Sequence, residues 1–267
     1  MARSRALLNV LNLVNVEELS VEQQFLNDLK ASIELQDKKE SRKPSQTYKP
    51  SSMHCIRNMY YQVTGAEGKA ETSSCELIGI CESGTDRHER LQEAVLKMKN
   101  NNIDCEYINV AKYVREHELD YLDIVKEPNF ENGYYETKLY HKELNMSFLC
   151  DGIVKYKGKY FILEIKTETS NKFWDRQGVN PDHILQGTAY SEAFNISKVL
   201  FVYECRDNCS KKAYILNVTE DMRKALVDKI KECDGYVERQ IPPPIPEDIA
   251  KKACAYCGYV ELCKGDK

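Results

Sequence analysis

Two stretches in the first hundred residues repeat apolar side chains at helical spacing. Apolar positions three or four residues apart form one face of a helix. In residues 16–35 they are Leu19, Leu26, Leu29 and Ile33, and in the second stretch they are Leu91, Ala94, Val95 and Met98. Ser83 followed by Asp86 resembles a capping arrangement and predicts the start of the second helix, which puts His88 in its first turns. Residues 36–52 are polar and basic and predict a solvated linker.

Apolar runs in the middle of the chain predict strands. Residues 146–154 and 160–167 form two such runs, separated by the turn signal Lys157-Gly158-Lys159, and together they predict a hairpin. Residues 106–136 are acidic, and we expect irregular structure there. Further along we predict helices at residues 182–195 and 220–233 and strands at residues 199–203 and 213–218. Strands and helices mixed in this order indicate an α/β or α+β core.

A proline-rich spacer precedes the C-terminal tail. It contains Pro242, Pro243, Pro244 and Pro246, which make the chain stiff. We therefore expect three parts: an N-terminal helical segment and linker at 1–53, a core at 54–240, and a cysteine-rich segment at 241–267.

The predicted hairpin carries acidic residues and a lysine on one side. Side chains alternate along a strand, so Glu164 and Lys166 share one face while Leu163 and Ile165 point to the other, into the core. Asp151 interrupts the apolar run on the partner strand and can meet Glu164. Two such carboxylates suit Mg²⁺ or Mn²⁺, and Lys166 can orient a water or stabilise a transition state. The alternative for the E-x-K pattern alone is a solvated amphipathic strand.

Composition narrows the choice of partners and compartment. The 267 residues carry a net charge of −4, which predicts no broad basic face for duplex DNA. Eleven cysteines cannot all pair, and residues 1–16 lack a cleavage signal, so we expect a reducing, cytoplasmic location. No stretch approaches the roughly 20 apolar residues that cross a bilayer, so we expect no membrane partner.

Three cysteines gather after the proline spacer. Cys254, Cys257 and Cys263 need a metal, because the surrounding tail is polar and too small to bury three thiols. A fourth ligand can come from elsewhere in the fold, and Cys55 lies alone before the core. Four thiolates suit an iron–sulfur cluster or structural Zn²⁺, and the spacing does not separate these two.

The order of these residues resembles the RecB-like branch of the PD-(D/E)XK nucleases. That family has a His, an Asp, an E-x-K and a Q-x-x-x-Y, and the matching residues here are His88, Asp151, Glu164 with Lys166, and Gln186 with Tyr190. The resemblance implies a restriction-endonuclease-like core, with a mixed central sheet flanked by helices. It further implies that His88, Asp151, Glu164 and the Ile165 carbonyl ligate the metal. Asp151, Glu164 and Lys166 would then be catalytic, while Gln186 and Tyr190 contact DNA.

The early and late cysteines resemble those of the iron–sulfur nucleases, which include CRISPR-associated adaptation exonucleases, AddB-type helicase–nucleases and related phage exonucleases. This resemblance implies a 4Fe-4S cluster held by Cys55, Cys254, Cys257 and Cys263. It implies an exonuclease on single-stranded DNA or DNA ends, working in a bacterial or phage-infected cell with recombination, replication or CRISPR-adaptation proteins.

Alternatives to this interpretation remain. One is a nucleic-acid-binding assembly subunit of a helicase or integrase complex with little cleavage, and another is a zinc-stabilised adaptor or transcriptional protein. Glu136 can be an additional acid, although nothing in its spacing requires it. We predict structural roles for the remaining histidines, which are His54, His117, His141 and His183.

Overall fold

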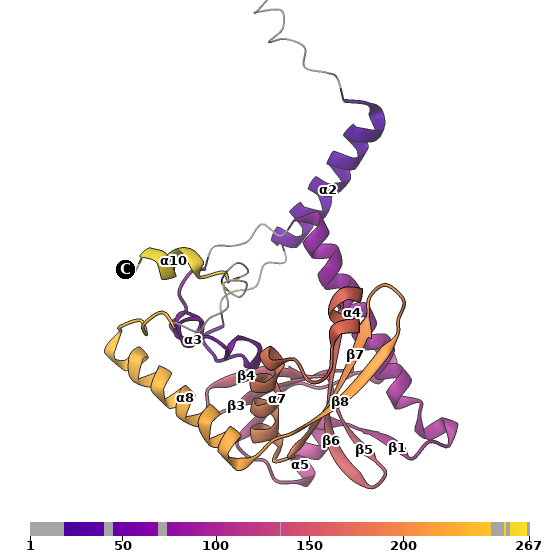
Figure 1. Ribbon diagram of the computed structural model, residues 1–267, viewed down its shortest axis with the longest axis vertical. Coiled ribbons are helices and arrows are strands. Elements are labelled where there is room, and N and C mark those ends of the chain that lie inside the picture. Colours follow the sequence, from indigo (N-terminus) through magenta and orange to yellow (C-terminus); the bar gives the residue numbers. More distant parts are fainter. Residues whose placement is uncertain are drawn as a thin grey trace, which may run out of the picture. The chain divides into compact units, whose positions relative to one another are not determined.

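A computed structural model describes the protein (Figure 1). The described residues are 19–39, 45–68, 74–133, 135–246, 254 and 257–265. The chain divides into two compact units, Met1–Arg42 with Thr72–Cys81, and Lys43–Glu71 with Glu82–Lys267. Residues 45–53, which we predicted as part of the N-terminal segment, belong to the larger unit.

The smaller unit contains helix α2 (Val21–Lys39) and the beginning of α4 (Cys75–Leu96). The Lys30 ammonium lies 2.8 Å from the Glu76 carboxylate, and the backbone N–H of Cys75 donates to Glu34. The predicted helix at 16–35 is therefore present, but it extends to Lys39, so the linker prediction is wrong for residues 36–39. Residues 16–18 lie outside the described part.

The larger unit is built around a five-stranded sheet. Its order is β1 (Cys105–Ile108), β5 (Gly152–Tyr156), β6 (Lys159–Glu168), β7 (Lys198–Cys205) and β8 (Lys211–Asn217). The β6–β7 pair is parallel and the other pairs are antiparallel, so the sheet is mixed. The predicted β5–β6 hairpin is confirmed. Lys157 and Gly158 both have positive φ, as the tight turn between twisted strands requires.

A second sheet has three antiparallel strands, which are β2 (Leu122–Lys126), β3 (Thr137–His141) and β4 (Met146–Cys150). The prediction of one strand over 146–154 is wrong, because the chain leaves this sheet after Cys150 and enters the larger sheet at Gly152. Gly152 permits the crossing, since a Cβ there would lie 2.6 Å from the Tyr107 ring. Asp151 stands at the junction between the two sheets.

Helices and short 3-10 turns connect these strands. The helices are α3 (Ile56–Val63), α5 (Val110–Glu116), α6 (Ser170–Asp175), α7 (Pro181–Phe194), α8 (Glu220–Arg239) and α10 (Val260–Gly265), and the 3-10 turns are η1 (Pro50–Ser52), η2 (Lys99–Asn101) and η3 (Phe130–Asn132). Helices α7 and α8 match the predicted ones, although α8 is longer. In the described part of the chain, no helix is long and apolar enough to cross a membrane.

Residues 106–136 contradict the prediction of irregular structure, because β1, α5 and β2 lie within or overlap this range. Helix α5 is too short to show a clear period. Its capping residue Asn109 accepts a hydrogen bond from the Lys112 N–H, and burial of Val110, Tyr113 and Val114 stabilises it. Tertiary packing therefore accounts for structure that the local pattern does not indicate.

Both faces of the large sheet are covered (Figure 1). Leu163 and Ile165 of β6 point into a core that includes Leu91 of α4, as predicted. Ile162 lies in the larger core with Phe194 of α7, so the opposite face of β6 is also packed. The fold is therefore a mixed α+β architecture in which Glu164 and Lys166 lie on the α7 side of the sheet.

The predicted start of the second helix at Ser83 is wrong, because α4 begins at Cys75. Ser83 lies inside the helix, where its hydroxyl accepts from Arg87 Nε at 3.5 Å. Gly79 and Gly84 have open space around their Cα atoms and do not interrupt the helix. His88 consequently lies well inside α4.

Candidate functional site

Asp151 is held by hydrogen bonds on both its side chain and its backbone. Its Oδ2 accepts from the Ile165 N–H at 2.6 Å, and its carbonyl accepts from the Tyr107 hydroxyl at 2.5 Å and from Gln92 Nε2 at 2.8 Å. The residue is only 5 % exposed. The other carboxylate oxygen, Oδ1, lies 3.4 Å from His88 Nδ1, so His88 and Asp151 meet as the sequence pattern implied.

Glu164 and Lys166 lie on one face of β6 and contact each other directly. Lys166 Nζ lies 2.5 Å from Glu164 Oε1, which also accepts from Gln186 Nε2 at 2.8 Å. Glu164 is 2 % exposed, and its second oxygen, Oε2, is buried without a hydrogen-bond donor among the described residues. A buried carboxylate oxygen without a partner is costly, which makes it a natural ligand for a cation.

The ionisation of these groups is strongly coupled to their surroundings. Burial raises the pKa of Glu164 to about 7, and the charge of Lys166 opposes that rise. Burial disfavours the charged form of Lys166, but the charges of Glu164 and Asp151 outweigh it and raise the pKa of the ammonium. In the same way, burial opposes the charged form of His88, and the hydrogen bond to Asp151 together with its charge raises the pKa above the ordinary value. A divalent cation would relieve the carboxylate repulsion at this centre.

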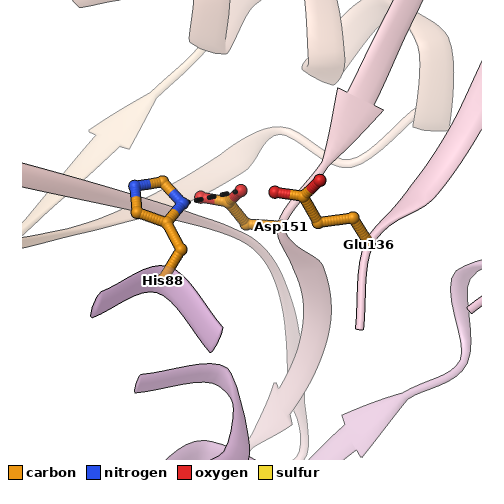
Figure 2. Close-up of side chains that lie close together, drawn as sticks. All are labelled: His88, Glu136 and Asp151. Carbon is orange, nitrogen blue, oxygen red and sulfur yellow. Dashed lines mark ion pairs between the residues drawn. The ribbon is translucent and has the colours of Figure 1, made fainter. Parts of the chain in front are cut away.

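The structure adds Glu136 to the site. Potential ligand atoms of His88, Glu136 and Asp151 all lie within 4.8 Å of one another, and Figure 2 shows the Glu136 carboxylate directed toward Asp151. Burial and the charge of Asp151 raise the pKa of Glu136. The β3–β4 register explains the proximity, because Thr137 pairs with Cys150, next to Glu136 and Asp151 respectively. The sequence named Glu136 as a possible additional acid, and the pairing of β3 with β4 is what brings it to Asp151.

Gln186 and Tyr190 share one face of α7, as their spacing predicts. Gln186 Nε2 donates to the Tyr190 hydroxyl at 2.9 Å as well as to Glu164, and Tyr190 donates to the Leu149 carbonyl at 3.0 Å. Both side chains are buried. They connect α7 to Glu164 and to β4, and their contact with DNA stays a prediction.

The four cysteines predicted as metal ligands line one cavity of about 40 Å³. Cys55 precedes α3, Cys263 lies in α10, and Asn58 Nδ2 donates to Cys257 Sγ at 3.5 Å. Burial raises the pKa of Cys55, and the nearby Cys257 and Cys263 raise it further. The described cysteines form no disulfide. The fold therefore brings together a thiol from the start of the predicted core and thiols from the C-terminal segment.

His183 also lies near Lys166. Its ring stacks against Phe201 and Tyr203, and its Nδ1 lies 3.0 Å from the Tyr203 hydroxyl. Burial, with the positive charges of Lys166, Arg176 and Lys172, lowers the pKa of His183 to about 3. The imidazole is thus neutral and packed. Its lowered pKa reflects the three cationic side chains nearby.

Comparison with known proteins shows a likeness to solved structures. No protein-family model matches the chain, and no curated protein matches it. The crystal structure of SSO0001 is similar to this chain with a TM-score of 0.50 and 18 % sequence identity, over 91 % of this chain and 98 % of that one. At this identity the likeness concerns the fold alone, and it extends over nearly the whole of both chains.

Proposed function

We propose that this protein is a divalent-metal-dependent deoxyribonuclease with a RecB-like PD-(D/E)XK core, acting as an exonuclease on single-stranded DNA or DNA ends. The observation that carries the proposal is the buried Glu164 Oε2, which has no hydrogen-bond donor among the described residues, beside Asp151 and Lys166. The sheet junction holds Asp151 in place, so the site has a rigid support.

The donor set fits Mg²⁺ or Mn²⁺. His88, Asp151, Glu164 and the Ile165 carbonyl would hold the ion, and Glu136 supplies a further carboxylate within reach of His88 and Asp151. Carboxylate and carbonyl oxygens are the ligands that these hard cations prefer. When bound, the ion supplies Lewis acidity toward the phosphodiester and lowers the pKa of water.

The protein's own groups would then hold the metal-binding carboxylates in position and donate hydrogen bonds to the attacking water or the phosphate. Lys166 keeps its positive charge because Glu164 and Asp151 surround it, and it can donate to the attacking water or to the phosphate. The Gln186 amide fixes the orientation of Glu164, and the Ile165 N–H fixes Asp151. Each catalytic carboxylate therefore has one oxygen restrained by a hydrogen bond.

The cysteine-lined cavity supports the proposal of a metal centre bound by thiols. All four cysteines line the same cavity. We propose a 4Fe-4S cluster, with structural Zn²⁺ as the alternative, since four thiolates suit either group. The role of the bound group would be to hold the ends of the core together.

The proposed setting is the cytoplasm of a bacterial or phage-infected cell, with recombination, replication or CRISPR-adaptation proteins as partners. The net charge of −4 favours a narrow path for one strand over a broad duplex-binding face.

Cleavage of defined DNA tests the proposed function. Anaerobically purified protein is incubated with end-labelled single-stranded and duplex DNA in the presence of Mn²⁺, Mg²⁺ or a chelator. We expect metal-dependent degradation of single strands, which Lys166→Ala abolishes. Lys159→Ala, which removes an exposed lysine of the same strand, is the matched control and should retain activity. Equal activity in chelator and in metal, or wild-type activity of Lys166→Ala, would refute the proposal.

A further inference from the structure

The single tryptophan of the chain lies exposed on the helix that follows the strand carrying Glu164 and Lys166. Trp174 belongs to α6, which follows β6 after Thr169, and it is 55 % exposed. The preceding Phe173 is 1 % exposed and anchors the helix to the core. The two rings meet edge to face, with centroids 5.1 Å apart and planes at 83°, so Phe173 does not stack on the indole.

The sheet register relates Trp174 to the catalytic lysine. Lys166 pairs with Tyr203 on β7, and Tyr203 pairs with Lys212 on β8, so the three residues form one row across the sheet. Neighbouring strands are about 4.8 Å apart, which places the backbone of Lys212 roughly 10 Å from that of Lys166. Lys212 Nζ lies 5.6 Å from the centre of the Trp174 ring. The indole therefore lies a few nucleotides at most from the proposed reaction centre.

The position of Trp174 is restrained by Lys212. The ammonium donates to the carbonyls of Phe173, Trp174 and Arg176 at 2.8, 3.2 and 3.1 Å. These bonds satisfy carbonyl groups at the end of α6, which would otherwise need water. The backbone of the helix that carries the indole therefore loses little conformational freedom when a ligand binds.

Several cationic side chains lie around α6. Lys166, Lys172 and Arg176 all lie close enough to His183 to lower its pKa. Lys172 and Arg176 also line a surface hollow, together with Asp175, which partly offsets their charge. Arg176 is paired with Glu168, whereas Lys172 forms no ion pair with the residues that the structure describes. Lys172 is therefore a cation of α6 that is available to a phosphate.

We infer that Trp174 is a stacking platform for one base of a single-stranded nucleic acid on its way to or from Lys166. This inference rests on the proposed nuclease function and adds a substrate-binding residue to it. An exposed indole can stack on any base, so the site would be tolerant of sequence. A base inside a duplex already stacks on its neighbours, so the platform selects single strands and frayed ends.

Intrinsic fluorescence provides a direct test, because Trp174 is the only tryptophan. Full-length Lys166→Ala protein is titrated with a short oligothymidylate in Mg²⁺, and tryptophan emission is recorded beside the anisotropy of a labelled copy of the oligonucleotide. We expect emission to be quenched in step with binding. An abasic oligonucleotide of equal length should bind more weakly and leave the emission unchanged.

Substitutions separate stacking from other effects. In the same background we expect Trp174→Ala to weaken single-strand binding about tenfold or more, and Trp174→Phe to retain most of it. Ile215→Ala is the matched control, since Ile215 is 50 % exposed and lies on β8 in opposite parity to Lys212. The affinity of Ile215→Ala for the single strand should remain that of the parent protein.

The outcomes distinguish the two proposals. If the oligonucleotide binds and is cleaved by the wild type while tryptophan emission does not change, the stacking platform is wrong and the nuclease stands. Equal quenching by blunt duplex would overturn the single-strand selectivity of the platform. If the wild type neither binds nor cleaves DNA, the nuclease proposal fails and the platform fails with it.

Discussion

The Asp151 carboxylate accepts a 2.6 Å hydrogen bond from the backbone N–H of Ile165, and this bond ties the junction of the two sheets to the strand that carries Glu164 and Lys166. It uses one carboxylate oxygen and leaves the other near His88 Nδ1. The same side chain therefore has an architectural role and a proposed metal-binding role, which two substitutions can separate.

Asp151→Asn keeps an acceptor for the Ile165 N–H and removes the charge. We expect the thermal stability of this variant to remain near that of the wild type while metal-dependent cleavage is lost. Asp151→Ala also leaves the buried N–H without its partner, which costs about 1–3 kcal/mol of stability. Calorimetry and cleavage assays on both variants check the prediction. A much lower melting temperature for Asp151→Asn would show that its charge, and not the hydrogen bond alone, stabilises the junction.

Glu136→Gln should weaken binding of Mn²⁺ and leave the fold intact, because Glu136 offers a carboxylate to the same position as His88 and Asp151. Isothermal titration with Mn²⁺ measures the change. Glu131→Gln, which alters an exposed acid of η3, serves as the control and should bind Mn²⁺ like the wild type. Unchanged affinity in Glu136→Gln would remove Glu136 from the ligand set.

Gln186→Ala should reduce metal affinity or cleavage about 10- to 100-fold, because the amide orients Glu164 in the manner of an outer-shell partner. Tyr190→Phe removes the hydroxyl that bonds Gln186 and the Leu149 carbonyl, and we expect a smaller loss in the same direction. Metal titration distinguishes this role from DNA contact: a loss of DNA affinity with normal metal affinity would favour the contact that the family resemblance implies.

The stability of the metal-free protein should depend on pH through Glu164. Because burial raises the pKa of this group to about 7, the folded state holds its proton more tightly than the unfolded chain. The resulting stabilisation is fully present below the ordinary pKa of a glutamate and is lost as the pH rises through the raised value. We expect melting temperatures to fall over this range, and Glu164→Gln to reduce the fall. Mn²⁺ should stabilise the wild type more at higher pH, since it binds the carboxylate. A pH profile of Glu164→Gln identical to that of the wild type would contradict this assignment.

Cys55→Ala and Cys257→Ala should give pale protein with a lower melting temperature, because a metal bound by thiols from both ends of the core adds its binding free energy to folding. Cys209→Ala, which removes an exposed thiol, should keep its colour. Iron and sulfide analysis checks the prediction on each variant. Stoichiometric zinc without sulfide in the wild type would replace the cluster with a zinc site.

Local patterns along the chain were sufficient to predict the β5–β6 hairpin, helix α7 and the shared face of Glu164 and Lys166. Each depends on turn residues, capping or side-chain period within a short segment. The strand at 146–154 had an adequate apolar pattern but broke at Asp151, since a run of apolar residues carries no information on which sheet each half joins.

The proximity of Glu136 to Asp151 and the assembly of the cysteine cavity depend on long-range packing. Glu136 reaches Asp151 because β3 pairs with β4, and the sequence of residues 137–141 does not indicate which strand they pair with. Similarly, Cys55 meets Cys257 and Cys263 through the packing of α3 against the C-terminal segment, across about two hundred residues of sequence. Side-chain periodicity and capping concern residues that are neighbours within one helix or strand. These contacts form instead because surfaces that lie far apart in the chain are buried against each other.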